Sequence, residues 1–224
     1  MRGVVAIKDA LLRHKKLAAL IGVIIVLLIA AGVAVTIWHA HQTKSTVAKN
    51  PVATQYKKEL PSLEKAVKAN PKSSDAHKNY AVALYATGDL KKALSEYQQV
   101  VKLNDKDAVA YNNLGNVYRD LGKYQDATDA YNKAISLDSS NMNTYANLAN
   151  VQLYMENDTN GAIATYKKGL KALPKNAQLE FLLGLAYEKK GDTTNARATY
   201  QHILSYDASN QSAQAELTAL QNNK

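Results

Sequence analysis

Apolar residues recur at spacings of three and four through most of the second half of the chain. The stretch 108–141, AVAYNNLGNVYRDLGKYQDATDAYNKAISLDSSN, shows the pattern twice. Its first half carries Tyr111, Leu114, Gly115 and Tyr118. Its second half carries Ala127, Tyr131, Ala134 and Ile135. Each half therefore predicts an amphipathic helix. Gly122 lies between them and can adopt the left-handed conformation that ends a helix, so the stretch is predicted to be a helical hairpin.

The same positions recur before and after this stretch at nearly constant spacing. Residues 74–107 hold Tyr80, Gly88, Ala93 and Tyr97 in matching places, and residues 177–210 hold Gly184, Tyr187, Gly191, Ala196 and Tyr200. Residues 142–176 match through Tyr145, Leu148, Ala162 and Tyr166, but they contain one extra residue before a turn in which Asn157 replaces Gly. The pattern predicts four consecutive hairpins over 74–107, 108–141, 142–176 and 177–210.

This arrangement resembles the tetratricopeptide repeat family. The family signature is an aromatic, Leu-Gly, Tyr, a turn Gly, Ala, an aromatic, Ala and a closing Pro, and residues 108–141 match all of it except the Pro, where Ser139 stands. The resemblance covers residues 74–210 and implies an all-α solenoid of about four repeats. We expect a half-repeat helix over 55–73, with Pro61 limiting or bending its early part, and a polar capping helix over 211–224.

A second hydrophobic pattern precedes the repeats. Residues 17–38, LAALIGVIIVLLIAAGVAVTIW, form an uncharged run, and about 20 such residues are enough to cross the ~30 Å hydrocarbon core as a helix. The run predicts one N-terminal transmembrane helix. A cleaved signal peptide is the alternative, since Gly32-Val33-Ala34 offers small residues at the right spacing, but the run continues past them to Trp38.

The charges around this run predict its orientation. Residues 1–16 form a short basic segment in which Arg13, Lys15 and Lys16 abut the run, whereas no Lys or Arg follows Trp38 before Lys44. By the positive-inside rule the N-terminus is cytoplasmic and the repeats are extracytoplasmic. Residues 39–54 are polar and read as a linker that separates the repeats from the bilayer.

Composition excludes several classes of function. The chain has no Cys, so it can form no disulfide or thiolate zinc site. His39 and His41 could in principle hold a metal, but a polar interfacial segment is the simpler interpretation. Residues 1–40 carry five basic residues and one acidic residue, which is +4 of the net charge of +9, so the repeat region is only mildly basic. No basic stripe or nucleic-acid-reading module is present. Without a phosphate loop, metalloprotease motif or nucleophile elbow, we expect no enzyme, no cofactor and no small-molecule substrate.

The resemblance implies that binding occurs on a concave face lined by the first helix of each hairpin. One column of that face carries Asn79, Asn113 and Asn147, spaced 34 residues apart (113 − 79 and 147 − 113). Carboxamides offer donors and an acceptor, so such a ladder could pair with a peptide backbone without reading side chains. We predict that the peptide-binding groove is formed by Lys78, Asn79, Asn112, Asn113, Asn116, Arg119, Asn147, Asn150 and Phe181.

Three alternatives stay open at this point. The Asn columns could be a family habit that hydrates the groove without binding anything. The family's carboxylate clamp for acidic chaperone tails is disfavoured, because Val82 stands where Asn is expected and Asn143 and Asn147 stand where Lys and Arg are expected. Phe181, with Leu182 and Leu185, could form an apolar ligand pocket, although packing against the terminal helix is the simpler explanation.

The sequence therefore predicts a membrane-tethered scaffold that binds a protein or extended peptide segment in its groove. The alternative is an accessory subunit of a membrane translocation or envelope-assembly complex, whose transmembrane helix is itself a docking element. The two differ in whether an unrelated apolar helix can replace residues 17–38 without loss of function.

Overall fold

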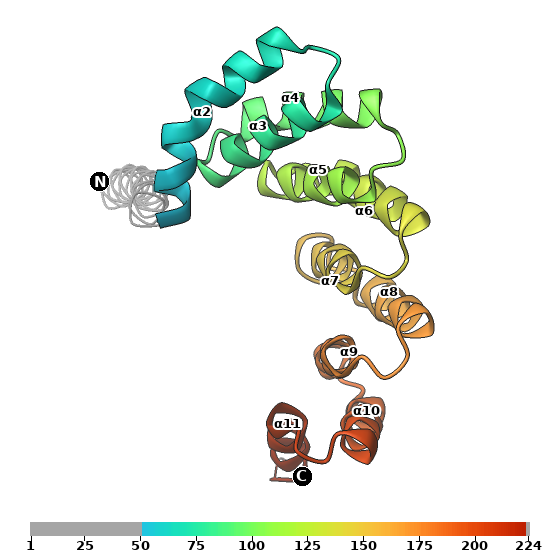
Figure 1. Cartoon of the computed structure of the whole chain (residues 1–224). Helices are drawn as coiled ribbons and strands as arrows, with labels where there is room; N and C mark the ends of the chain where they lie inside the picture. The colour runs from blue at the N-terminus through green and yellow to red at the C-terminus, as the bar shows by residue number, and fades with distance from the viewer. Residues whose placement is uncertain (1–50, 223–224) are drawn as a thin grey trace, which may run out of the picture. The chain divides into compact units, whose positions relative to one another are not determined.

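The computed structural model describes residues 51–222 (Figure 1). This part of the chain contains ten α-helices, one π-helix and no strand. In chain order they are α2 (Pro51–Ala69), α3 (Ser74–Ala86), α4 (Leu90–Leu103), α5 (Ala108–Asp120), α6 (Tyr124–Leu137), α7 (Met142–Asn150), the π-helix η1 (Val151–Met155), α8 (Thr159–Ala172), α9 (Ala177–Lys190), α10 (Thr193–Tyr206) and α11 (Gln211–Asn222).

The chain divides into two compact units at Gln55 and Tyr56, and the second unit holds the repeats. Within it, α3 packs on α4, α5 on α6, α7 on α8 and α9 on α10, so each pair is a hairpin. The second helix of each hairpin also contacts the first helix of the next, and α10 contacts α11 in the same way (Figure 1). This nearest-neighbour packing confirms the predicted all-α repeat solenoid.

Helix boundaries follow from capping residues that recur with the repeats. Asp107 begins α5 by accepting a hydrogen bond from the backbone N–H of Ala110 at 2.9 Å, which satisfies one of the donors left free at a helix start. Asp89, Asp158, Asn176 and Asp192 act in the same way on their helices. Gly122 adopts φ +74 between α5 and α6, as its place in the turn predicts.

Small residues and tyrosines pack the helices of a hairpin together. A Cβ added at Gly115 on α5 would lie 2.6 Å from Cε1 of Tyr131 on α6, so the absence of a side chain allows this close approach. Gly184 faces the ring of Tyr200 in the same manner. Four tyrosines in this column of the second helices are fully buried: Tyr97, Tyr131, Tyr166 and Tyr200. Their burial explains why the column holds a large aromatic side chain.

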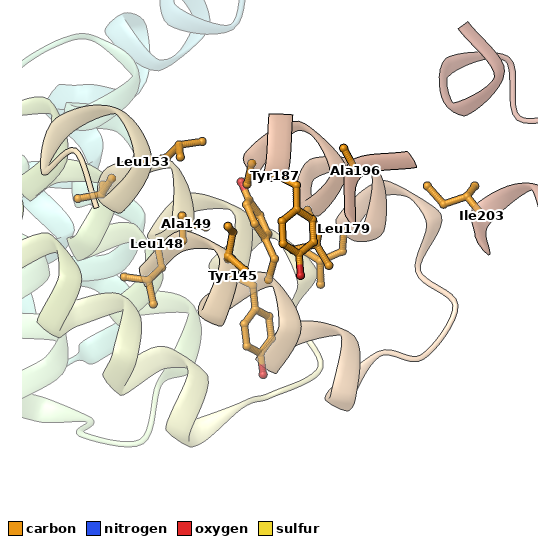
Figure 2. Close-up of a cluster of buried hydrophobic side chains, with 14 of the residues drawn as sticks. Tyr145, Leu148, Ala149, Leu153, Leu179, Tyr187, Ala196 and Ile203 are labelled. Atoms are coloured by element: carbon orange, nitrogen blue, oxygen red, sulfur yellow. The ribbon is translucent and has the colours of Figure 1, made fainter. Parts of the chain in front are cut away.

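The buried apolar side chains form two clusters. The first joins α3, α4, α5 and α6, and Leu60, Leu63 and Val67 of α2 pack against it. The second extends from α6 to α11, and Figure 2 shows its central part around Tyr145, Leu179 and Tyr187. Partly buried Tyr118 contacts both clusters.

α2 differs in detail from the helix expected over 55–73. It begins at Pro51 and continues through Pro61 to Ala69. Proline removes a backbone donor and disturbs the preceding turn. Next to Pro61, the hydroxyl of Ser62 donates to the carbonyl oxygen of Glu59 at 2.8 Å.

The predicted basic segment 1–16, the transmembrane helix over 17–38 and most of the linker 39–54 lie outside the described residues. Among residues 51–222, no helix combines the length and the apolar character needed to cross a membrane.

Candidate functional site

Four of the predicted groove residues form one hydrogen-bonded group across α5 and α7, which we call the carboxamide network. Asn112 Nδ2 donates to Asn113 Oδ1 at 3.3 Å within α5. From α7, Asn147 Nδ2 donates to Asn112 Oδ1 at 3.4 Å and to Asn116 Oδ1 at 3.2 Å. All four side chains are partly buried. The network therefore links the first helices of two successive repeats.

A buried tyrosine fixes one member of the carboxamide network. The hydroxyl of Tyr131 on α6 donates to Asn116 Oδ1 at 2.7 Å. Burial raises the pKa of Tyr131, so its phenol stays protonated at neutral pH and remains a donor. Tyr166 donates to Asn150 Oδ1 at 3.3 Å one repeat later. The sequence indicated only packing for this column, because a periodic pattern does not show where a hydroxyl points.

The carboxamide network leaves a donor and an acceptor without partners. Asn116 Oδ1 accepts from both Tyr131 and Asn147, which uses the two lone pairs of that oxygen. No group in residues 51–222 accepts from Asn116 Nδ2, and none donates to Asn147 Oδ1. The free donor and the free acceptor belong to two side chains that are joined by the hydrogen bond from Asn147 Nδ2 to Asn116 Oδ1. This pair complements a peptide group, which offers one C=O and one N–H.

The two basic residues of the predicted groove are already paired. Lys78 Nζ lies 3.1 Å from Asp107 and 3.3 Å from Asp75, and the hydrogen bond to Asp107 raises the lysine pKa. Arg119 Nε donates to Asp120 at 2.8 Å. The hydroxyl of Tyr85 donates to the same carboxylate at 2.7 Å. The contacts of Lys78 with Asp107 and of Tyr85 with Asp120 join neighbouring hairpins. Both cations already have carboxylate partners, with which a ligand would compete.

The remaining predicted residues lie apart from the carboxamide network. Asn79 is exposed on α3, and Asn150 is exposed at the end of α7. Phe181 on α9 packs against the second cluster, with its ring centroid 5.6 Å from that of Tyr200. This contact is made with α10, whereas the packing interpretation placed Phe181 against the terminal helix.

A pocket that the sequence did not indicate opens between α5 and α6. It has a volume of about 240 Å³, and Tyr111, Tyr118, Asp126 and Asp129 contribute to its lining. The Lys133 ammonium lies 5.8 Å from the Tyr111 ring centroid at this place. Within residues 51–222, no group of three His, Asp or Glu side chains is arranged to hold a metal ion. The pocket between α5 and α6 thus brings tyrosine rings, carboxylates and an ammonium group together.

Comparison with known proteins agrees with this architecture. Family models described as tetratricopeptide repeat match residues 108–141 and 153–220, and one described as TPR repeat matches residues 81–119. A crystal structure of MamA is 25% identical, covers 68% of this chain and 89% of its own, and superposes with a TM-score of 0.62. YrrB, described as a TPR protein with an unusual peptide-binding site, is 22% identical over 70% of this chain and 81% of its own, with a TM-score of 0.55.

A shorter match extends to an animal protein. The BBSome complex member bbs-4 of Caenorhabditis elegans is 41% identical over 56 residues, which are 25% of this chain. The chain spans only 12% of the length of that relative. Residues 81–141 and 153–220, with their stacked hairpins, thus belong to the tetratricopeptide repeat family.

Proposed function

We propose that this chain is a membrane-tethered scaffold that binds an extended peptide segment of a protein partner across α5 and α7, without catalysis. The observation that carries the proposal is the unpartnered pair in the carboxamide network, Asn116 Nδ2 and Asn147 Oδ1. A partly buried donor and acceptor on one surface gain most from a ligand that satisfies both at once.

The partner's backbone supplies the matching groups. A peptide carbonyl accepts from Asn116 Nδ2, and a peptide N–H donates to Asn147 Oδ1. Each bond contributes about 0.5–1.5 kcal/mol, so this pair gives modest affinity that depends little on the partner's sequence. Tyr131 and Asn147 hold Asn116 before the peptide arrives, which reduces the entropy lost on binding. The likeness to MamA and YrrB supports a protein-binding scaffold.

The tether is the part of this proposal that rests on residues 17–38. Their apolar length and the preceding Arg13, Lys15 and Lys16 support a membrane helix with a cytoplasmic N-terminus and extracytoplasmic repeats. Protease added to the outer face of spheroplasts should degrade the repeats and leave an N-terminal tag intact. Protection of the repeats would contradict this orientation.

Two variants of the full chain test the peptide site. Asn116→Asp keeps the oxygen that accepts from Tyr131 and Asn147 but replaces the amide donor by a second oxygen, and Asn147→Ala removes the acceptor. Peptides would be selected with the wild-type chain from a displayed library of random sequences, and their affinities measured by fluorescence anisotropy. We expect each variant to weaken binding by at least about threefold, since one hydrogen bond is lost.

Asn132→Ala serves as the control, because Asn132 is exposed on α6 and lies outside the network. It should bind the selected peptides as tightly as wild type. Equal affinity of Asn116→Asp, Asn147→Ala and wild type would show that the carboxamide network is only a feature of the scaffold.

A further inference from the structure

The third hairpin departs from the regular repeat at the π-helix η1. The backbone N–H of Glu156 donates to the carbonyl of Val151 at 3.0 Å, a bond five residues back that closes one wide turn. Val151 and Leu153 are both buried there. The next two side chains, Tyr154 and Met155, are 61% and 49% exposed. The turn thus presents two large apolar residues to solvent.

Comparison of repeat positions identifies the residue that the π-helix accommodates. Arg119 precedes Tyr154 by 35 residues (154 − 119), whereas Glu188 follows it by 34 (188 − 154). The extra residue therefore lies before Tyr154, and Gln152 fits that place. Its Oε1 accepts from the hydroxyl of Thr165 on α8 at 2.7 Å. Because Gln152 is the inserted residue, Tyr154 occupies the repeat position that Arg119 occupies in the second hairpin.

One lysine lies over the exposed tyrosine, and two more lie on the neighbouring helices α8 and α9. The Lys189 ammonium, at the end of α9, lies 4.8 Å from the ring centroid of Tyr154. Lys167 of α8 lies 5.4 Å from the ring centroid of Tyr187, and Lys190 follows Lys189. All three lysines are exposed. An ammonium over an aromatic face keeps its N–H donors available, so these cations can still bind an anion.

The acidic side chains near these lysines have other partners. Glu188 accepts from the buried Tyr200 hydroxyl, and Glu156 accepts from Thr128 at 3.3 Å. Asp192 caps α10, and its pKa is lowered first by hydrogen bonds from Asn195 and then by the charges of Lys190 and Lys167. The charges of Lys190 and Lys167 therefore act partly on Asp192. We call Tyr154, Met155, Lys167, Lys189 and Lys190 the Tyr154 patch.

We infer that the Tyr154 patch binds an acidic and apolar stretch of the same partner peptide, with an apolar side chain on Tyr154 and Met155 and neighbouring carboxylates on the lysines. This inference rests on the proposed function and adds to it the chemistry of the partner. Tyr154 follows Asn147 by seven residues on the α7–η1 segment, about 10 Å of helix. An extended peptide covers that distance in about three residues.

The displayed peptides selected on the full chain provide the first readout. We expect enrichment of Asp or Glu within about three positions of a Leu, Phe or Met. Tyr154→Ala should weaken binding of those peptides by at least about fivefold, as expected for a central aromatic contact. Lys189→Gln should weaken it by about two- to fivefold, and the loss should shrink at high salt.

Two exposed positions on other repeats give matched controls. Leu103→Ala removes an exposed apolar side chain at the end of α4, and Lys106→Gln removes one charge between α4 and α5. Neither should change the affinity. If Asn116→Asp weakens binding while Tyr154→Ala and Lys189→Gln do not, the Tyr154 patch is overturned and the proposed function survives. If no peptide is enriched, both the Tyr154 patch and the proposed function are contradicted. Both are also contradicted if the two network variants and the two patch variants all bind peptides as tightly as wild type.

Discussion

Two buried tyrosines of the second helices, Tyr131 and Tyr200, each act at two places. The ring of Tyr131 packs against Gly115 of α5. Its hydroxyl donates a hydrogen bond to Asn116, the residue that follows Gly115 on α5. Tyr200 repeats this arrangement with Gly184 and Glu188. Packing and the orientation of a polar surface group therefore depend on the same side chain. A change at the glycine disturbs both.

Substitution of Gly115 by Ala tests this close approach. The added Cβ would meet the Tyr131 ring at 2.6–2.9 Å, so the helices must separate or the ring must move. We expect a loss of about 1–3 kcal/mol in the free energy of unfolding, measured by urea denaturation followed by circular dichroism. In a Tyr131→Leu background the same substitution should cost clearly less, because the ring is absent. An equal cost in both backgrounds would contradict the proposed contact.

At the scale of the element, α11 closes the apolar end of the array. Ala213 and Leu217 are buried against α10, and Arg197 Nη2 donates to the carbonyl of Leu220 at 3.0 Å. The helix is otherwise polar, as expected for a segment with one packed face and one solvated face. The few buried residues of α11 therefore hold this helix on α10.

Leu217→Asp should detach this helix, because it places an unpaired charge at a buried site. Amide hydrogen exchange should then accelerate in α10 and α11 and stay close to wild type in α3 to α6, since repeats transmit stability mainly to their neighbours. Gln221→Asp, at an exposed position of the same helix, should leave exchange unchanged. Uniform loss of protection along the array would indicate a cooperative core instead.

For the molecule as a whole, tyrosine burial predicts sensitivity to alkali. Burial raises the pKa of Tyr97, Tyr131, Tyr166 and Tyr200, and burial with a hydrogen bond to Asp120 raises that of Tyr85 to about 12. An unfolded tyrosine titrates near pH 10. The folded state therefore holds protons that the unfolded state has released, and stability is complete below about pH 10 and lost as pH rises further.

Thermal unfolding between pH 7 and pH 12 checks this expectation. The melting temperature should fall steeply from about pH 10 upward, and the part of the phenolate absorbance that comes from the buried tyrosines should rise together with the loss of helix. A melting temperature that stays constant through pH 11.5 would contradict the effect of burial on the tyrosines.

The sequence predicted the repeat array well because its signals are local. Spacings of three and four fix the helices, and Gly122 fixes a turn. The geometry of the candidate site depended on side-chain orientations and on contacts between hairpins, which residue spacing does not predict. The columns placed Asn116 and Asn147 on one surface but could not give the rotation of their amides. Lys78 contacts Asp107, the cap of α5, through the stacking of one hairpin on the next, and the insertion gave no sign that it would become a π-helix.

The two buried clusters meet mainly at α5, α6 and Tyr118, and this junction has a mechanical consequence. If the array were pulled between a fixed N-terminus and a bound partner, force would pass through one cluster and then the other. Because no single core spans all the hairpins, one cluster can yield while its neighbour still carries the load. Stretched in an optical trap, the chain should lengthen in at least two separate steps, and Gly115→Ala should lower the force of the step at the junction.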